Sequence, residues 1–243
     1  MLKGDIISYT KPKSIAAEAF RALRTNLEFS LSSDKSKVIL VTSSHVSEGK
    51  SSVASNLAAV FAMQNKKTIL IDADMRRGIQ HKKFGVSNQN GLSNYLANIN
   101  IDGDDIFKRT DILNLALITC GPVPPNPAEL LSLDAMKELL RFLKDNYDIV
   151  IIDGAPVLPV TDSVILASLV DRVVIVASAG ETHNEELKEV KSKLDAAGAN
   201  IAGVVLNKVD MKRKGYTKYG KYGNGYYASY YGEDHEEKTK RRK

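Results

Sequence analysis

Short apolar segments alternate along the chain with longer segments whose apolar residues recur at helical spacing. Residues 38–42 read as a buried strand, and the apolar residues of the segment 50–64 repeat every three or four positions. Further strand-like runs are residues 68–71, 149–152 and 201–206, and further helical segments are residues 14–31, 128–146 and 185–197. This alternation predicts an α/β fold, in which a mainly parallel sheet is covered by helices on both faces.

The loop between residues 42 and 50 carries a phosphate-binding signature. It matches the pattern G-x-x-x-x-G-K-[ST] at Gly49, Lys50 and Ser51, with Ser44 in place of the first glycine. A strand, a tight loop and a helix form the context that a P-loop needs, whereas a lysine that caps an ordinary turn is the alternative. In a P-loop the backbone N–H groups bind phosphate, the lysine reaches the β- and γ-phosphates, and the hydroxyl ligates Mg²⁺. The loop residues expected to bind ATP are Val46, Ser47, Glu48, Gly49, Lys50, Ser51 and Ser52.

Aspartates directly follow two of the predicted strands. Asp72 and Asp74 belong to the run Asp-Ala-Asp-Met-Arg that ends at Arg76, and Asp153 begins the run Asp-Gly-Ala-Pro. Open parallel sheets bind ligands at the carboxyl ends of their strands. A single aspartate at such a position is usually a helix cap or a turn residue. Three of them beside a P-loop favour a site that organises Mg²⁺ and the group that attacks the phosphate.

Tyrosines crowd the C-terminal segment. Seven of the ten tyrosines lie there: Tyr216, Tyr219, Tyr222, Tyr226, Tyr227, Tyr230 and Tyr231. Phenolic hydroxyl groups on a chain that binds ATP suggest phosphoryl transfer to itself. Residues 211–243 also hold ten of the 34 Lys and Arg residues but only four of the 29 acidic ones, so the net charge of +5 lies wholly in this segment. A solvated, disordered terminus is the default interpretation, weak attraction to anionic lipid is an alternative, and nucleic-acid binding is disfavoured.

These motifs together resemble those of one family, the bacterial tyrosine autokinases (BY-kinases) of capsule and exopolysaccharide synthesis. The family's three nucleotide motifs resemble the loop before Ser51, the D-x-D-x-R of residues 72–76 and the D-x-x-P of residues 153–156. The resemblance covers nearly the whole chain and includes Glu18-x-x-Arg21-x-x-Arg24, residues 121–129 and the terminal tyrosines. The loop departs from the family, which commonly has a Pro-Gly pair where this chain has Val46 and Ser47.

The resemblance implies a P-loop NTPase fold and an ATP-dependent protein-tyrosine kinase. Such an enzyme phosphorylates its own terminal tyrosines, here expected in trans, and regulates the synthesis and export of capsular or extracellular polysaccharide. We take Asp72 as the candidate base for the tyrosine proton. The implied catalytic residues are Lys50, Asp72, Asp74 and Arg76, and the implied Mg²⁺ ligands are Ser51, Asp74 and Asp153.

The resemblance also implies partners. The helix that carries Glu18, Arg21 and Arg24 is expected to reach a neighbouring subunit in a ring-like homo-oligomer, although Arg21 also has the spacing for an ion pair with Glu18 within the helix. The family's kinases work with a transmembrane adaptor that is fused in some and separate in others. We expect a separate adaptor here, together with a cognate tyrosine phosphatase.

Two short features bear on the nucleotide and on the rival function. Asn207 begins the run N-K-x-D, which reads guanine in GTP-binding proteins, but the D-x-x-P of residues 153–156 replaces their D-x-x-G, so we interpret Asn207 as an adenine contact. The leading rival is an ATPase switch of the chromosome-partitioning or septum-positioning kind, without kinase activity. Its P-loop carries a second lysine at the position of His45. A third alternative, an assembly module whose C-terminal tail only mediates contacts, is also compatible with the sequence.

The sequence predicts three parts: an N-terminal arm and oligomerisation helix at residues 1–35, the P-loop kinase domain at 36–210 and a flexible tyrosine-rich tail at 211–243. The apolar run near residues 173–177 is too short to cross a bilayer, and no signal peptide opens the chain. We therefore expect a cytoplasmic protein that an adaptor recruits to the inner face of the membrane. Cys120 is the sole cysteine and the four histidines lack metal-ligand spacing, so each histidine is interpreted as a surface or packing residue.

Overall fold

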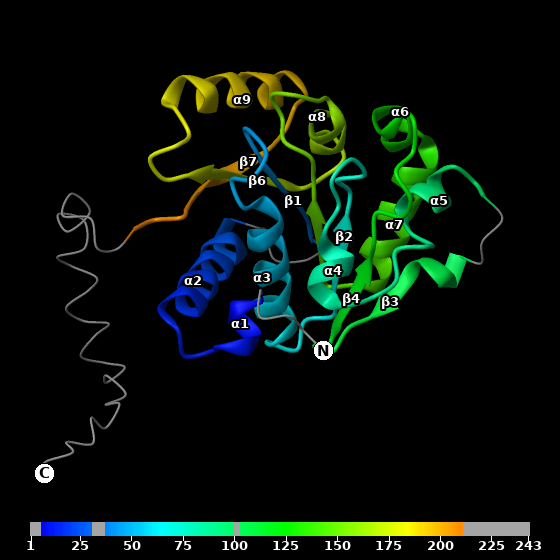
Figure 1. Ribbon diagram of the computed structural model, residues 1–243, viewed down its shortest axis with the longest axis horizontal. Helices are drawn as coiled ribbons and strands as arrows, with labels where there is room; N and C mark the ends of the chain where they lie inside the picture. Colours follow the sequence, from blue (N-terminus) through cyan, green and yellow to red (C-terminus); the bar gives the residue numbers. More distant parts are fainter. Residues whose placement is uncertain (1–5, 31–36, 100–102, 211–243) are drawn as a thin grey trace, which may run out of the picture. The chain divides into compact units, whose positions relative to one another are not determined.

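The computed structural model describes residues 6–30, 37–99 and 103–210. Its centre is a seven-stranded sheet with the strand order β3-β4-β2-β5-β1-β6-β7 (Figure 1). The strands are β1 (Lys37–Ser43), β2 (Thr68–Asp72), β3 (Phe107–Arg109), β4 (Leu115–Ile118), β5 (Ile149–Asp153), β6 (Arg172–Ser178) and β7 (Ile201–Asn207). Neighbouring strands are parallel except β3, which pairs antiparallel with β4 at one edge. The predicted α/β class with a mainly parallel sheet is confirmed.

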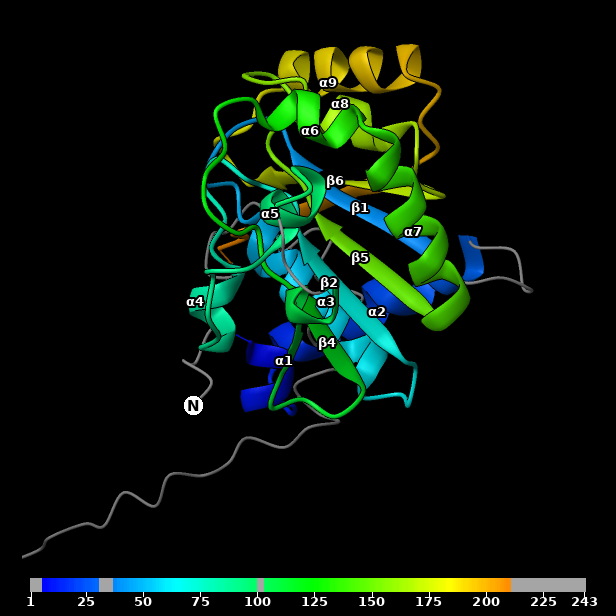
Figure 2. The same ribbon diagram turned by 90° about the vertical axis from the view of Figure 1, so that its right-hand side faces the viewer.

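Helices cover both faces of this sheet (Figures 1 and 2). The helices α1, α2 and α3 pack on one face, whereas α5 to α9 pack on the other. Their bounds are α1 (Ile7–Thr10), α2 (Ile15–Ser30), α3 (Lys50–Ala62), α4 (Gln80–Phe84), α5 (Leu92–Leu96), the 3-10 helix η1 (Gly103–Ile106), α6 (Pro127–Ser132), α7 (Asp134–Asn146), α8 (Asp162–Ala167) and α9 (Asn184–Ala196).

Side chains of the central strands alternate between two hydrophobic cores. In β1, Val38 and Leu40 belong to the core under α7, and Ile39 and Val41 belong to the core under α3. All four are fully buried. Because both faces of the strand are covered, the sequence shows a continuous apolar run rather than an alternation of apolar and polar residues.

One expected helix is divided in two. The segment 128–146 forms α6 and α7, which are separated at Leu133, where φ is −64° and ψ is 150°. Leu131 and Met136 lie on either side of this break and are both fully buried. In one continuous helix these two side chains would point about 140° apart. The extended residue lets both of them face the core.

The topology brings the sequence motifs to one edge of the sheet. β5 lies between β2 and β1, and Asp72 at the end of β2 is in register with Asp153 at the end of β5. The P-loop leaves the same end of β1. The chain divides into two units, Met1–Lys208 and Val209–Lys243, and the site lies in the first. Among the described residues, no helix has the length and apolar character needed to cross a membrane.

Candidate active site

The P-loop connects β1 to α3 and passes through two residues with positive φ. These are Ser47, with φ of 65°, and Gly49, with φ of 98°. Gly49 also lies against Asn207, because a Cβ at position 49 would come within 2.0 Å of the Asn207 Nδ2 atom. Only glycine satisfies both conditions. Ser44, which stands where the motif has its first glycine, is accommodated with its side chain fully buried.

Side chains from neighbouring segments hold this loop in place. The Glu48 carboxylate accepts hydrogen bonds from the backbone N–H of His45 at 2.8 Å and from the Thr182 hydroxyl. Asn207 Nδ2 donates to the backbone carbonyl of Glu48 at 2.9 Å. The His45 ring lies 3.0 Å from the carboxylate of Glu186. Glu48 is thus part of the loop, and Asn207 at the end of β7 contacts it. Thr182 and Glu186 are further loop contacts that sequence reasoning missed.

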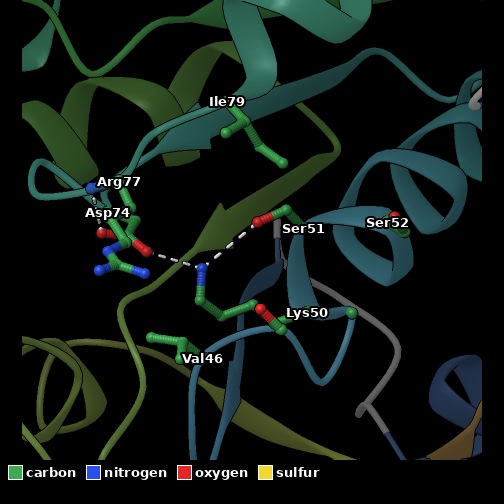
Figure 3. Close-up of a pocket in the computed structure, with 9 residues that line it drawn as sticks. Val46, Lys50, Ser51, Ser52, Asp74, Arg77 and Ile79 are labelled. Atoms are coloured by element: carbon green, nitrogen blue, oxygen red, sulfur yellow. Dashed lines mark hydrogen bonds and ion pairs between the residues drawn. The ribbon is translucent and has the colours of Figure 1, made fainter.

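A pocket of about 230 Å³ opens beside the P-loop (Figure 3). At its centre the Lys50 Nζ atom donates to Asp74 Oδ2 at 2.7 Å and to Ser51 Oγ at 3.3 Å. Asp153 Oδ1 lies 3.7 Å from the same ammonium group. All three sequence motifs therefore meet at one side chain. The pocket is lined by Val46, Ser47, Gly49, Lys50, Ser51, Ser52, Asp74, Arg77 and Ile79.

Charges in the site perturb one another strongly. Burial by itself would lower the pKa of Lys50, but the Asp153 and Asp74 carboxylates outweigh burial and the pKa is raised. The pKa of Asp72 is raised well above its usual value, first because the side chain is fully buried and second because Asp153 is close. Burial also raises the pKa of Asp153, and the Lys50 ammonium opposes this effect.

The oxygen atoms of the site fit a hard divalent cation. Ser51, Asp74 and Asp153 present a hydroxyl and two carboxylates around the Lys50 ammonium. The Asp153 Oδ1 atom is buried and accepts no hydrogen bond from any described residue. Hydroxyl and carboxylate oxygens are ligands that Mg²⁺ takes in nucleotide sites.

Gln80, the first residue of α4, connects all three motifs although none of them includes it. Its Nε2 atom donates to the Ser51 carbonyl at 2.9 Å and to Asp153 Oδ2 at 2.8 Å. Its backbone N–H donates to Asp72 Oδ2 at 2.9 Å. The side chain is fully buried. In the sequence nothing separates this glutamine from an ordinary surface residue, so reasoning from motifs missed it.

The two arginines after Asp74 take different directions. Arg76 forms a double hydrogen bond with the buried Asp162 at the start of α8, with distances of 2.9 and 3.1 Å. Arg76 is therefore directed away from the pocket lining, whereas Arg77 is part of it. The backbone N–H of Arg77 donates to Asp74 Oδ1 at 2.9 Å. The motif marked Arg76 and missed both Arg77 and Asp162.

Glu18, Arg21 and Arg24, the three residues of α2 that the motif marked, do not act as one group. The Arg21 guanidinium bonds to the Glu18 carboxylate at 2.7 Å, and both side chains keep a share of solvent exposure. Arg24 is buried against α3 and donates to the carbonyl of Val60 at 3.3 Å. Within this subunit, Arg24 thus has a packing role that the spacing did not reveal.

The expected phosphate acceptors lie outside the described residues. They are Tyr216, Tyr219, Tyr222, Tyr226, Tyr227, Tyr230 and Tyr231. The structure therefore describes the pocket beside the P-loop but not the tyrosines that are expected to receive the phosphate.

The chain is similar to known protein-tyrosine kinases. Residues 36–201 match the AAA domain family. The chain is 37% identical over 226 residues to the putative tyrosine-protein kinase CapB of Staphylococcus aureus. This alignment covers 93% of this chain and 94% of that protein. The solved kinase domain of the Escherichia coli tyrosine kinase ETK matches with a TM-score of 0.83 and 38% identity, over 86% of this chain and 82% of that one. The chimerical protein CapA2B2 matches with a TM-score of 0.80 and 38% identity, over 85% and 91%.

A more distant likeness defines the shared fold. The septum site-determining protein MinD from Pyrococcus horikoshii, solved with Mg-ADP, matches with a TM-score of 0.61 and 22% identity over 70% of each chain. This likeness shows a common fold and no more. The rival ATPase switch therefore shares the fold, and the distinction from it lies in the side chains of the site.

Proposed function

The chain belongs to the family of bacterial protein-tyrosine kinases, and from this premise we propose that it transfers the γ-phosphate of ATP to tyrosines of its own C-terminal segment. One observation carries the proposal. The P-loop Lys50 points into a pocket and is held at 2.7 Å by Asp74 and at 3.7 Å by Asp153, which follow two other strands. This arrangement supports phosphoryl transfer, whose catalysis rests mainly on positioning and charge neutralisation.

We propose separate roles for the residues around the pocket. The loop amides from Val46 to Ser51 bind phosphate oxygens, and Lys50 neutralises the β- and γ-phosphates. Ser51, Asp74 and Asp153 hold Mg²⁺, directly or through water. When bound, Mg²⁺ neutralises charge that develops on the phosphate oxygens. Arg77 lines the pocket and adds a cation on the side of Asp74.

The proposed transfer step needs one base, which accepts the proton of the tyrosine hydroxyl. The tyrosine oxygen forms a bond to the γ-phosphorus, the bond from that phosphorus to the β,γ-bridging oxygen breaks, and ADP leaves. The phenolic proton passes to Asp72, whose raised pKa makes it a stronger base than an exposed carboxylate. Asp74 lines the pocket and Asp72 does not. Asp72→Ala should therefore lower the rate of transfer more than the affinity for ATP, and a comparable loss of both would contradict this assignment.

One side chain argues against the ATPase switch. That class needs a lysine at the position of His45, and here the His45 ring pairs with Glu186 on α9 at 3.0 Å. Asn207 is proposed to contact the adenine, since its Nδ2 atom already touches the P-loop carbonyl of Glu48. Arg76 is proposed to act through Asp162, by fixing the turn that carries Asp74.

We also propose an assembly that regulates polysaccharide synthesis and export. The helix α2 presents the Glu18–Arg21 pair together with Ile15 and Phe29, which are 69% and 85% exposed. Charged and apolar groups on one exposed helix support contact with a neighbouring subunit in a ring-like homo-oligomer. A separate transmembrane adaptor would recruit this assembly peripherally to the membrane and activate it, and a cognate phosphatase would reverse the modification.

Incubation with labelled ATP distinguishes the candidate functions. Purified chain is incubated with Mg²⁺ and ATP labelled in the γ-phosphate, beside a Lys50→Met variant and a Lys66→Met control that changes an exposed lysine. The proposal predicts phosphotyrosine on the wild type and on Lys66→Met but not on Lys50→Met. Release of free phosphate without labelled protein would identify an ATPase switch, and neither product would identify an assembly module.

A further inference from the structure

Three potential metal ligands that do not line the pocket lie close together, although they are far apart in the sequence. Asp72 ends β2, His81 lies in α4, and Cys120 lies two residues beyond the end of β4. One ligand atom from each of them lies within 4.8 Å of the other two. The strand order places β4 next to β2, which explains how Cys120 reaches the aspartate motif.

Two of these residues each have a potential ligand atom that lacks a hydrogen-bond partner. The Asp72 Oδ1 atom and the His81 Nδ1 atom are buried and make no hydrogen bond to any described residue. Asp72 is fully buried, and only its other oxygen, Oδ2, accepts a hydrogen bond, from the backbone N–H of Gln80. A buried acceptor without a partner costs about 1–3 kcal/mol, so such atoms call for an explanation. A bound cation would satisfy both.

The thiol of Cys120 makes only long hydrogen bonds, and a glycine leaves space beside it. Its nearest hydrogen-bond partners are Asn88 Oδ1 at 3.5 Å and its neighbour's carbonyl at 3.4 Å. Gly78 lies against both the thiol and the carboxylate, because a Cβ at position 78 would come within 2.4 Å of Cys120 Sγ and 2.8 Å of Asp72 Oδ2. Glycine at this position leaves the thiol and the carboxylate free to approach a common ligand.

The chemical types of the three potential ligands indicate which metal ion fits this cluster. A thiolate, an imidazole and a carboxylate are zinc ligands, whereas Mg²⁺ takes oxygen donors only. A divalent ion with one thiolate, one carboxylate and a neutral imidazole makes a complex without net charge, which suits a buried position. Ligand atoms around tetrahedral zinc lie about 3.3–3.8 Å apart, so binding requires a contraction of at most about 1.5 Å.

We propose that Asp72, His81 and Cys120 form a zinc site, and that zinc bound there inhibits the kinase by occupying the Asp72 carboxylate. On binding, the Cys120 thiol loses its proton to solvent and the sulfur bonds to the metal, with no change of oxidation state. The fourth position of the tetrahedron is left for water. The inhibitory part of the proposal rests on the role of Asp72 in the proposed function, whereas metal binding itself does not.

Spectroscopy tests binding without any use of kinase activity. Full-length chain is titrated with Co²⁺ and then Zn²⁺, under reducing conditions and without nucleotide, as wild type, Cys120→Ser, His81→Asn and His235→Asn. The last variant is the control, because His235 stands among acidic residues of the tail and could bind metal independently. Cobalt bound to a thiolate gives a sulfur-to-metal charge-transfer absorption, which reports directly on Cys120.

The expected result is one charge-transfer site per chain in the wild type and in His235→Asn. We expect Cys120→Ser to lose the absorption, and both Cys120→Ser and His81→Asn to bind Zn²⁺ at least about 10–100-fold more weakly. Equal zinc affinity in wild type and Cys120→Ser would overturn the site. Two different substitutions are used so that misfolding of one does not decide the outcome.

Inhibition is then measured in the same four proteins with buffered Zn²⁺ and excess Mg²⁺ and ATP. Zinc should suppress autophosphorylation of the wild type and of His235→Asn, relative to the zinc-free activity of each, and should leave Cys120→Ser largely unaffected. A zinc site that forms while autophosphorylation stays unchanged would overturn the inhibitory role. Absence of any autophosphorylation without zinc would contradict the proposed function instead, and the cobalt spectrum would still report on the site.

Discussion

Gln80 Nε2 donates a hydrogen bond to Asp153 Oδ2 at 2.8 Å and links the start of α4 to the end of β5. The same atom donates to the Ser51 carbonyl at the first turn of α3. A single buried amide therefore sets the position of a proposed Mg²⁺ ligand relative to the P-loop. We therefore expect Gln80 to act as a positioning residue in the proposed transfer reaction.

Gln80→Leu should lower both stability and rate. The substitution leaves the Asp153 oxygen and the Ser51 carbonyl without their donor, which costs about 1–3 kcal/mol for each buried group left unsatisfied. We expect a lower melting temperature and a loss of about tenfold or more in the rate of autophosphorylation, if about 1.4 kcal/mol of positioning is lost. Thermal unfolding and initial rates measure the two effects.

Gln89→Leu is the matched control for this substitution, because Gln89 is exposed. It should leave rate and melting temperature nearly unchanged. A Gln80→Leu enzyme with the wild-type rate at saturating ATP would show that Gln80 does not position the site.

Asp72→Asn should stabilise the fold while it removes the proposed base. Between its unfolded pKa, about 4, and its raised folded pKa, the folded chain binds more protons at Asp72 than the unfolded chain does. The free energy of unfolding therefore falls as pH rises through this interval. Asparagine removes this penalty, so the gain in melting temperature should be larger at about pH 8 than at about pH 5. A gain of about 1 kcal/mol corresponds to roughly 2–4 °C.

Asp134→Asn provides the opposite case. Asp134 is exposed, and its hydrogen bond with Lys137 lowers its pKa. Its small contribution to stability is present above the unfolded pKa and is lost as pH falls, so the substitution should never stabilise the fold. If Asp72→Asn lowered the melting temperature at about pH 8, the assignment of a raised pKa to Asp72 would fail.

Arg21→Ala and Arg24→Ala should separate assembly from folding. Arg24 is buried against the carbonyl of Val60, so its loss leaves an unsatisfied acceptor and should lower the melting temperature of the subunit. Arg21 pairs with Glu18 on the exposed side of α2, and its loss should reduce the size of the oligomer with little effect on unfolding. Light scattering and thermal unfolding on the same samples give both readouts. Unchanged size in Arg21→Ala would argue against α2 as the interface.

The part of the site that the sequence predicted depends on topology alone. A parallel sheet brings the carboxyl ends of its strands to one edge, so Lys50, Asp74 and Asp153 meet once the motifs are assigned to strand ends. Motif spacing was sufficient because Asp153 ends a buried strand, Asp74 lies two residues beyond another, and the P-loop connects a third to Lys50. The fold class followed from the same alternation of strands and helices.

Contacts made by side chains across the fold were not predictable in this way. Gln80 and Asp162 lie in segments without a strong period, and their importance comes from the distant residues that they contact. The break at Leu133 depends on which leucine and methionine the core must accept, which periodicity within one segment does not show. Ser47 stands where the family commonly has glycine, yet the backbone still takes the positive φ of 65°.

Transfer between two distinguishable chains tests the central claim, namely that this site phosphorylates the terminal tyrosines of another copy. A Lys50→Met chain, which keeps its tyrosines, is mixed with a chain that has an intact site and phenylalanine at all seven of the terminal tyrosine positions. With ATP labelled in the γ-phosphate, the account predicts label on tyrosines of the Lys50→Met chain in the mixture and none on either chain alone. Absence of label from both chains in the mixture, while the wild type alone is labelled, would contradict transfer between subunits.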